Sequence, residues 1–207
     1  MDRDFGFAPN PFHGFCSLAT CKPGIRNHAS LGDWVFGMGG ARLNAVGKCI
    51  FAMRVSEAVA FDAYWKETRF RIKRPVRNGS RRMLVGDNVY HRDPENYSWR
   101  QADSHHSNHD GTVNMHNLEV DTKANRVLIS HHFYYFGKSA PSVPNEILFE
   151  LGYQNGRNYR VFDESSAKPL IKWLDQSFAS DLNCVLNDPF DFDQSEKRYS
   201  VKTNSVS

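Results

Sequence analysis

The sequence brings a thiol, an ammonium group and a guanidinium group together in one short segment, as Cys21, Lys22 and Arg26. Such groups could clamp a phosphate or polarise the carbonyl of a nucleobase. Asp33 and Trp34 follow in a Gly-Asp-Trp run and offer a carboxylate and a stacking face. The candidate catalytic residues here are Cys21 and Lys22. The candidate ligand-binding residues are Arg26, Asp33 and Trp34, although a tight turn with solvated charges and a buried cysteine would explain the same sequence.

A second polar segment, residues 87–111, carries groups suited to acid–base chemistry and to base recognition. Seven of the nine histidines lie between residues 91 and 132, so their side chains could converge. A histidine that titrates near neutral pH can act as a general acid or base. The candidate catalytic residues here are Asp87 and His105. The candidate ligand-binding residues, which offer hydrogen bonds to a base edge or faces for stacking, are Asn88, Tyr90, Trp99, Gln101, Ser104 and His106.

The same histidines and carboxylates would also suit zinc, iron or manganese. However, the sequence contains no HExxH motif and no CxxC pair. His105 and His106 are adjacent, so on a strand they would face opposite sides. We therefore expect no metal site, and the sequence indicates no particular cofactor. A polar surface loop without any ligand remains the simple alternative.

Basic residues gather between residues 66 and 82, where Glu67 is the one acid. This basic strip consists of Lys66, Arg69, Arg71, Lys73, Arg74, Arg77, Arg81 and Arg82. Such a run is either a solvated face or a strip that follows the phosphates of a nucleic acid, in which case binding would depend steeply on salt. Aromatic residues make up 13% of the chain, and some interleave with basic and polar residues, which suits base stacking.

The length and composition are typical of one globular domain. The chain has 207 residues, of which 40% are hydrophobic and 24% charged. We expect a single domain over residues 1–190, followed by a polar tail over residues 191–207. A net charge of +3 does not by itself establish a nucleic-acid partner. The sequence shows no membrane span and no signal peptide, so we expect a cytoplasmic protein with reduced cysteines and no membrane partner.

Hydrophobic patterning predicts more strand than helix. Strands are expected at residues 15–19, within 31–37, and at 48–55, 83–90 and 126–136. Helical spacing of apolar residues predicts helices at 55–65 and 167–178. The Lys-Pro-Gly sequence at 22–24 favours a type II turn.

Seven short motifs are spread over about residues 4–145. They are FGFAPNPF (5–12), CSLATCKPGIR (16–26), GDW (32–34), GDNVY (86–90), SHHS (104–107), VLIS (127–130) and FYYFG (133–137). In combination they resemble the nucleotide modification associated domain 2 family, whose members are linked to DNA base hypermodification. The resemblance implies a nucleotide or nucleic acid as partner, with DNA favoured over RNA, but it implies no particular reaction.

A weaker resemblance rests on Lys22 and Arg26 ahead of the Gly32-Asp33 turn, which is similar to the PUA, ASCH and EVE barrels that bind RNA or modified bases. One ASCH branch hydrolyses acylated cytidine with a Lys, a Thr and a downstream Glu. Here Thr20 and Lys22 stand in the wrong order for that pattern, so we retain only the fold analogy. The expected fold class is α+β, a PUA/ASCH/EVE-like mixed β-barrel with two or three flanking helices.

We therefore expect the chain to recognise a nucleotide or a modified nucleic-acid base, in association with DNA base hypermodification. Two alternatives remain open: an enzyme that completes a base or nucleotide modification, and a sensor or sponge in phage or bacterial defence that captures a signalling nucleotide without chemistry. Each requires residues 20–34 and 87–111 to fold onto the walls of one pocket. The sequence determines neither the ligand nor the oligomeric state.

Overall fold

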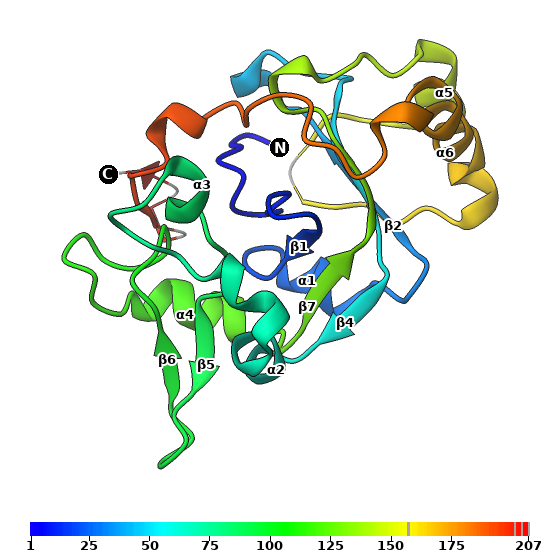
Figure 1. Cartoon of the computed structure of the whole chain (residues 1–207). Coiled ribbons are helices and arrows are strands. Elements are labelled where there is room, and N and C mark those ends of the chain that lie inside the picture. Colours follow the sequence, from blue (N-terminus) through cyan, green and yellow to red (C-terminus); the bar gives the residue numbers. More distant parts are fainter. Residues whose placement is uncertain (157, 201, 204, 207) are drawn as a thin grey trace.

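Helices and short strands alternate along the chain in the computed structural model, which describes all residues except 157, 201, 204 and 207 (Figure 1). The helices are α1 (Pro23–His28), α2 (Phe61–Lys66), α3 (Arg81–Leu84), α4 (Met115–Thr122), α5 (Asn145–Glu150) and α6 (Glu164–Ser177). Short 3-10 helices lie at Ala41–Leu43, Thr68–Lys73, Gly137–Ser139, Ala179–Asp181 and Phe192–Gln194.

The described strands form four small antiparallel sheets. Two of these sheets have three strands, in the orders β1-β7-β4 and β2-β3-β8, and two are ribbons, β5-β6 and β9-β10. The strands are β1 (Cys16–Leu18), β2 (Trp34–Met38), β3 (Cys49–Arg54), β4 (Glu57–Val59), β5 (Tyr90–Arg92), β6 (Trp99–Gln101), β7 (Val127–Ser130), β8 (His132–Tyr135), β9 (Tyr199–Ser200) and β10 (Ser205–Val206).

The apolar run at residues 126–136 connects the two larger sheets. The sequence predicts one strand here, but the chain breaks at the exposed His131. The hydroxyl of Ser130 donates to the carbonyl of His132 across the break, at 2.8 Å. As a result β7 pairs with β1 and β4, whereas β8 pairs with β3. One continuous sequence pattern thus serves two sheets.

Aromatic side chains of the N-terminal loop fill much of the core. Phe5, Phe7, Phe12 and Phe15 are buried in one cluster with residues from α2, β5 and β7. The carboxylate of Asp4 accepts a hydrogen bond from the hydroxyl of Tyr135, which fixes the start of the loop against β8. The loop is therefore a structural part of the domain, and it lies directly beside the site described below.

The C-terminal segment also packs onto the body of the domain. Residues 191–200 were expected to form part of a polar tail, yet Phe192 is 5% exposed and lies against Phe12, with ring centroids 5.3 Å apart. The backbone N–H of Asp191 donates to the carbonyl of Asp4 at 2.7 Å. Hence the two ends of the chain stabilise each other.

One predicted element is wrong in type, and another is correct only in its second half. Residues 83–90 form the end of α3 and an irregular segment, with a strand only from Tyr90. The backbone of this segment bonds to the preceding 3-10 helix, because the N–H of Asn88 donates to the carbonyl of Lys73 at 3.0 Å. Gly86 permits this approach, since a Cβ there would lie 2.5 Å from the same carbonyl oxygen. The helix predicted at 55–65 is instead β4 followed by α2.

The predicted α+β class is confirmed, but the PUA-like barrel is not, since no sheet in the described part of the chain closes on itself. The predicted strands at 15–19, 31–37 and 48–55 correspond to β1, β2 and β3, and the helix predicted at 167–178 lies within α6 and the residue after it. None of the described helices has the length and apolar character needed to cross a membrane.

Candidate active site

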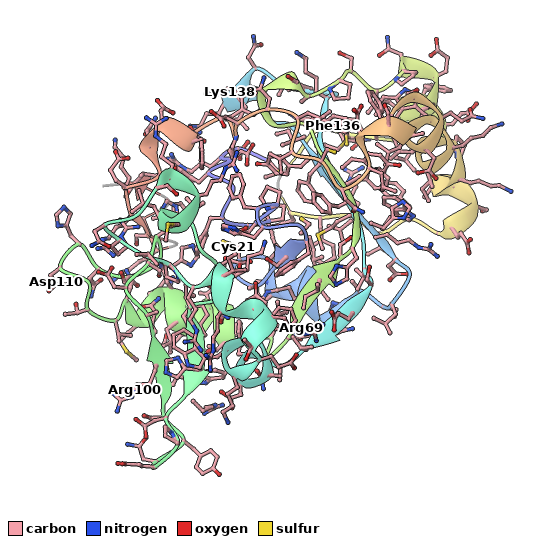
Figure 2. The ribbon with its side chains drawn as sticks, in the orientation of Figure 1. Cys21, Arg69, Arg100, Asp110, Phe136 and Lys138 are labelled. Carbon is pink, nitrogen blue, oxygen red and sulfur yellow. The ribbon has the colours of Figure 1, made fainter. Side chains whose placement is uncertain are left out.

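Cys21 lies in a strained turn between β1 and α1 (Figure 2). Cys21 and Lys22 both adopt the left-handed backbone conformation, with φ of 55° and 41°. For a residue with a side chain this conformation costs roughly 1–2 kcal/mol, and such residues collect at functional sites. The type II turn predicted at 22–24 does not form, because Pro23 begins α1. Proline is favoured at this position, since the first residue of a helix does not need its N–H for a hydrogen bond within the helix. A strand, a strained nucleophile and a helix in this order also build the nucleophile elbow of hydrolases.

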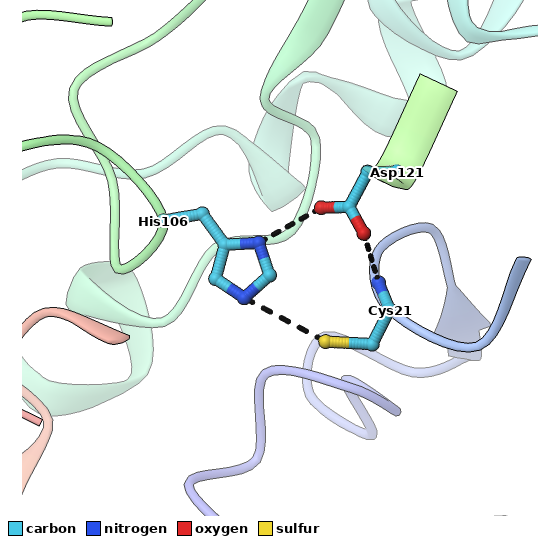
Figure 3. A group of neighbouring side chains, drawn as sticks. All are labelled: Cys21, His106 and Asp121. Atoms are coloured by element: carbon cyan, nitrogen blue, oxygen red, sulfur yellow. Dashed lines mark hydrogen bonds and ion pairs between the residues drawn. The ribbon is translucent and has the colours of Figure 1, made fainter. Parts of the chain in front are cut away.

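Cys21, His106 and Asp121 form a continuous chain of contacts (Figure 3). The Sγ atom of Cys21 lies 3.6 Å from Nε2 of His106. On the other side of the ring, Nδ1 of His106 lies 2.8 Å from Oδ2 of Asp121. The second carboxylate oxygen accepts the backbone N–H of Cys21 at 2.7 Å. This is the arrangement of a nucleophile, a base and an orienting acid.

The imidazole of the triad carries a positive charge. Burial lowers the pKa of His106, but Cys21 and Asp121, through their charges and hydrogen bonds, outweigh burial and raise this pKa to about 10. His106 is therefore an imidazolium at neutral pH. The nucleophilic form of a cysteine is its thiolate, and an adjacent imidazolium is one of the environments that favour a thiolate in general. Cys21 is partly exposed, whereas the side chains of His106 and Asp121 are 0% exposed, so Cys21 is the member of the triad that reaches the surface.

Asp121 is held on the buried face of α4. The side chain of Asn114 caps the first turn of this helix by accepting the N–H of Asn117, at 3.0 Å. Leu118 and Asp121, one turn apart, then both face the interior. The carboxylate of Asp121 also accepts the hydroxyl of Tyr90 at 2.8 Å. With three hydrogen bonds to its two oxygens, Asp121 is satisfied as a buried anion.

The backbone of His106 is fixed by two amide side chains. Gln101 Nε2 donates to the His106 carbonyl at 3.1 Å and to the hydroxyl of Tyr90 at 3.1 Å. Asn117 Nδ2 donates to the same carbonyl at 2.9 Å. The His106 N–H donates to the hydroxyl of Ser104 at 3.3 Å. Gln101 therefore bonds both to the backbone of His106 and to Tyr90, the residue whose hydroxyl donates to Asp121.

Arg26 ties the nucleophile turn to the end of α4. Its side chain is 0% exposed, and its Nε donates to the carbonyl of Cys21 at 2.9 Å. The two Nη atoms donate to the carbonyls of Asp121, Ala124 and Arg126 at 2.5 to 2.7 Å. These bonds satisfy carbonyls at and beyond the helix C-terminus, where a cation is also favoured. Arg26 thus acts as an internal clamp.

The three side chains could also hold a metal ion, since one ligand atom from each lies within 4.8 Å of the others. The imidazole, however, directs one nitrogen at each neighbour. The two ring nitrogens point away from each other, so a single ion could be bound by the ring and by both partners only if the ring left its bond to Asp121. The geometry favours proton transfer over metal binding.

A cavity of about 1300 Å³ opens beside the nucleophile turn. Side chains from α1, β2, α6 and the segment before α6 line it, among them Lys22, Asp33 and Trp34. Trp34 stacks on Phe36, with ring centroids 5.7 Å apart, and so presents an aromatic wall. No residue of 87–111 is part of the described lining. The two predicted segments therefore meet through Cys21 and His106 and do not share this cavity, which corrects the expected arrangement.

One comparison with known proteins identifies the family. The family model of nucleotide modification associated domain 2 matches residues 1–196, which include Cys21, His106 and Asp121. The chain belongs to the Nmad2 family. No curated protein matches it, and no solved structure does. The resemblance to the PUA, ASCH and EVE group is not confirmed.

Several residues predicted to touch a ligand instead support the triad of this Nmad2 chain. Tyr90, Gln101 and Ser104 are all buried and bond to Asp121 or His106, as described above. Arg26 likewise bonds only to carbonyls among the described residues. His106, predicted as a ligand-binding residue, occupies the position of the base.

The predicted catalytic residues Asp87 and His105 lie outside the triad. Asp87 is buried and accepts hydrogen bonds from Ser17 Oγ at 2.7 Å and Tyr64 OH at 2.8 Å. His105 is buried, which lowers its pKa to about 3, and its Nδ1 donates to the carbonyl of Lys197 at 2.6 Å. It is therefore a neutral imidazole that holds the C-terminal segment.

The remaining predicted residues also have internal partners. The amide nitrogen of Asn88 donates to the carbonyls of Tyr64 and Phe70 at 2.7 and 3.1 Å. Trp99 packs edge-on against Phe61, with centroids 5.7 Å apart, and the guanidinium of Arg92 lies 3.8 Å from its ring centroid. Asn88 thus bonds to α2 and to the 3-10 helix that follows it, while Trp99 packs the β5-β6 ribbon against α2.

Asp121 is the functional residue that sequence reasoning missed. It stands in a largely polar segment, and the apolar spacing around it is weak. One signal was available: Asp121 follows Leu118 by three residues, so a helix would place a carboxylate on the same face as a core leucine. A carboxylate on the inner face of a helix is rare unless it is paired.

Proposed function

We propose that this Nmad2 chain is a cysteine-dependent enzyme that transfers an acyl group to or from a nucleotide or a nucleic-acid base. One observation carries the proposal: the sulfur of Cys21 lies 3.6 Å from Nε2 of His106, whose other nitrogen bonds to the buried Asp121. The family supplies the connection to nucleotide modification. Charge-assisted activation of a thiol has no evident use in simple recognition.

The reaction proceeds in two balanced steps. The thiolate of Cys21 adds to the carbonyl carbon of an ester or amide, and the proton of the His106 imidazolium passes to the leaving oxygen or nitrogen. This forms a thioester and a neutral imidazole. A second nucleophile, either an amine or hydroxyl of the nucleotide or a water molecule, then attacks the thioester carbon. Its proton returns to His106 as the thiolate leaves, so no oxidant, reductant or metal is required.

Asp121 and Lys22 have distinct supporting roles in this scheme. Asp121 holds the Nδ1–H form of His106 and stabilises its positive charge. Lys22 follows the nucleophile directly, is exposed, and lines the large cavity. Its ammonium group is placed to attract a phosphate or a carboxylate of a substrate bound there.

A second candidate function is recognition of a nucleotide or modified base without chemistry, including capture of a signalling nucleotide in defence. The cavity supports it, because its volume of about 1300 Å³ accommodates a nucleotide and Trp34 offers a face for base stacking. This candidate gives no role to the activated thiol. A cytoplasmic location and a preference for DNA over RNA remain parts of the proposal.

The test uses acyl donors and intact-protein mass spectrometry. We expect the wild-type protein, mixed with p-nitrophenyl acetate or N4-acetylcytidine, to gain one acetyl group on the peptide that contains Cys21. Cys21→Ser should not gain a thioester, and His106→Asn should gain it at least about 100-fold more slowly, as expected for loss of a general base.

The matched control is Cys184→Ser, which removes the exposed cysteine and should leave acetylation of Cys21 unchanged. Equal acyl turnover by wild-type protein and Cys21→Ser would contradict the enzyme proposal. If that result came with tight nucleotide binding by both proteins, it would favour recognition instead.

A further inference from the structure

A second, smaller pocket lies next to the turn at residues 104–107, which carries His106. It has a volume of about 380 Å³ and is lined by Arg77, His109, Glu196, Lys197 and Arg198. The pocket joins the basic strip to the C-terminal segment. In Figure 1, α3 and the C-terminal strands lie at the same side of the molecule, and the guanidinium of Arg77 bonds to the carbonyl of Glu196 across this junction.

The pocket carries more positive than negative charge on its fixed groups. Arg77 and Arg198 share one carboxylate: Asp103 bonds to Arg198 and lies 3.9 Å from Nε of Arg77. Burial and the charge of Arg198 lower the pKa of Arg77, which shows that the two cations repel each other. Lys197 adds a third cation to the lining. Glu196, the one acid in the described lining, is exposed to solvent.

The two guanidinium groups are held in place before any ligand arrives. The side chains of Arg77 and Arg198 are only 19% and 12% exposed. Arg77 Nη1 donates to the carbonyl of Leu84 at 3.3 Å. Arg198 bonds to the carbonyl of Ser104 at 2.8 Å and to the hydroxyl of Ser107, in each case through Nη1. Preorganised guanidinium groups with donors to spare are suited to phosphate.

The pocket is coupled to the active site by the turn at residues 104–107. Arg198 bonds to Ser104 and Ser107, which flank His105 and His106. The carbonyl of Lys197 accepts Nδ1 of His105 at 2.6 Å. A group bound in the pocket would therefore contact Lys197 and Arg198, the residues that bond to the short turn carrying His106.

We propose that this pocket, formed by Arg77, Lys197 and Arg198, binds a phosphate group of the nucleotide or polynucleotide substrate. The inference rests on the proposed function for the identity of the substrate, but phosphate binding can be measured without catalysis. The exposed Arg81 and Arg82 of α3 extend the positive surface beyond Arg77 and would follow adjoining phosphates of a strand.

The experiment measures binding of a short fluorescein-labelled single-stranded oligodeoxynucleotide by fluorescence anisotropy over a range of salt. The variant is Lys197→Glu, because Lys197 contacts His105 through its backbone carbonyl and not through its side chain. We expect the Kd to rise about tenfold and the dependence of log Kd on log salt to weaken by about one unit, as for loss of one phosphate contact.

The matched control is Lys172→Glu, an equal change of charge at an exposed position of α6. It should leave the Kd and its salt dependence close to the wild-type values. Identical behaviour of Lys197→Glu and Lys172→Glu would overturn the proposal, as would the absence of binding to the oligonucleotide and to nucleoside monophosphates.

Competition distinguishes the two sources of the phosphate. Displacement of the probe by deoxynucleoside 5′-monophosphates, but not by the nucleosides, would identify a terminal phosphate as the ligand. Displacement by unlabelled oligonucleotide alone would identify a phosphodiester. Either result supports the pocket, whereas displacement by nucleosides as strong as by monophosphates contradicts it. The two proposals can fail separately. If the acyl chemistry is wrong, the Cys21→Ser protein should still bind the oligonucleotide, and that binding should still depend on Lys197.

Discussion

The imidazole of His106 faces a thiol on one edge and a carboxylate on the other, and this asymmetry determines what the site can do. Asp121 fixes the proton on Nδ1, which leaves Nε2 to exchange a proton with Cys21. The neighbouring His105 cannot take this role, because it is turned toward the carbonyl of Lys197. The two neighbouring histidines therefore differ in role because their rings face different partners, and not because of their residue type.

Replacing Asp121 with Asn tests this orientation. The amide would retain much of the shape but would present an N–H or a neutral oxygen to Nδ1, so the imidazolium loses its anionic partner. We expect acetylation of Cys21 to slow by about 10²- to 10⁴-fold, by analogy with the orienting acid of other triads. Rates from stopped-flow release of p-nitrophenol give the comparison.

Glu119→Gln is the matched control, because Glu119 is an exposed carboxylate on the same helix. If Asp121→Asn and Glu119→Gln acetylated at the same rate, an orienting role for Asp121 would be wrong.

Among the elements, the connection of α1 to α4 matters most for the site. Neither helix is long, and the two are held together by Arg26, whose guanidinium reaches four carbonyl groups. The strained backbone at Cys21 and Lys22 persists because this clamp and the bond from the Cys21 N–H to Asp121 restrain the turn from both sides.

We expect Arg26→Met to destabilise the protein by about 3 kcal/mol or more, since it leaves several buried carbonyls without a donor at about 1–3 kcal/mol each. Urea denaturation measures the change in the free energy of unfolding. Arg54→Met removes an exposed arginine that donates to the carbonyl of Gly32 at 3.3 Å, and it should change stability by less than about 1 kcal/mol. Equal effects of the two variants would contradict the clamp.

Sequence patterns predicted these elements unevenly. The apolar and aromatic runs predicted β2 and β3 correctly. β3 is buried on both faces over most of its length, which requires a continuous apolar sequence, whereas β2 alternates buried and half-buried residues. The strand predicted at residues 83–90 was wrong. The segment is apolar like a strand, but its backbone bonds to a 3-10 helix instead of to a neighbouring strand.

The site was predicted in part. Cys21 and His106 were among the candidate residues. Asp121 was missed, because its role depends on which face of α4 is buried, and that is decided by tertiary packing.

At the scale of the whole molecule, a second buried network stabilises the packing of the N-terminal loop. The ammonium group of Lys73 donates to the carbonyls of Asn10 and Phe15 at 2.8 and 2.9 Å. Burial lowers the pKa of Lys73 to about 8, and burial raises the pKa of Asp87 to about 6. Both groups are therefore charged near pH 7 and attract each other.

Replacing one of these two charged residues should lower the free energy of unfolding more than replacing both. Lys73→Met or Asp87→Asn alone leaves one buried charge unpaired, and we expect each to destabilise by about 3–5 kcal/mol. The double variant should recover part of that loss. Urea denaturation of the four proteins gives the coupling free energy, and additive losses would contradict the pairing.

The same network predicts a pH dependence of stability. Asp87 holds its proton more tightly in the folded state, so its contribution falls as pH rises from the ordinary value of 3.8 through about 6. Lys73 releases its proton more readily when folded, so its contribution grows as pH rises from about 8 toward 10.5. Relative to the double variant, the wild-type protein should therefore be least stable between these two ranges.

The central claim, that His106 activates the thiol of Cys21, is tested most directly by the rate of iodoacetamide labelling at each cysteine as a function of pH. Cys184 is exposed and serves as an ordinary thiol within the same molecule, while burial raises the pKa of Cys16 and Cys49 to about 12 and keeps both unreactive. At about pH 6, where an ordinary thiol is less than about 1% ionised, we expect Cys21 to be labelled at least about tenfold faster than Cys184, and His106→Asn to abolish the difference. Labelling of Cys21 that follows the same pH profile as Cys184, with or without His106, would contradict the account.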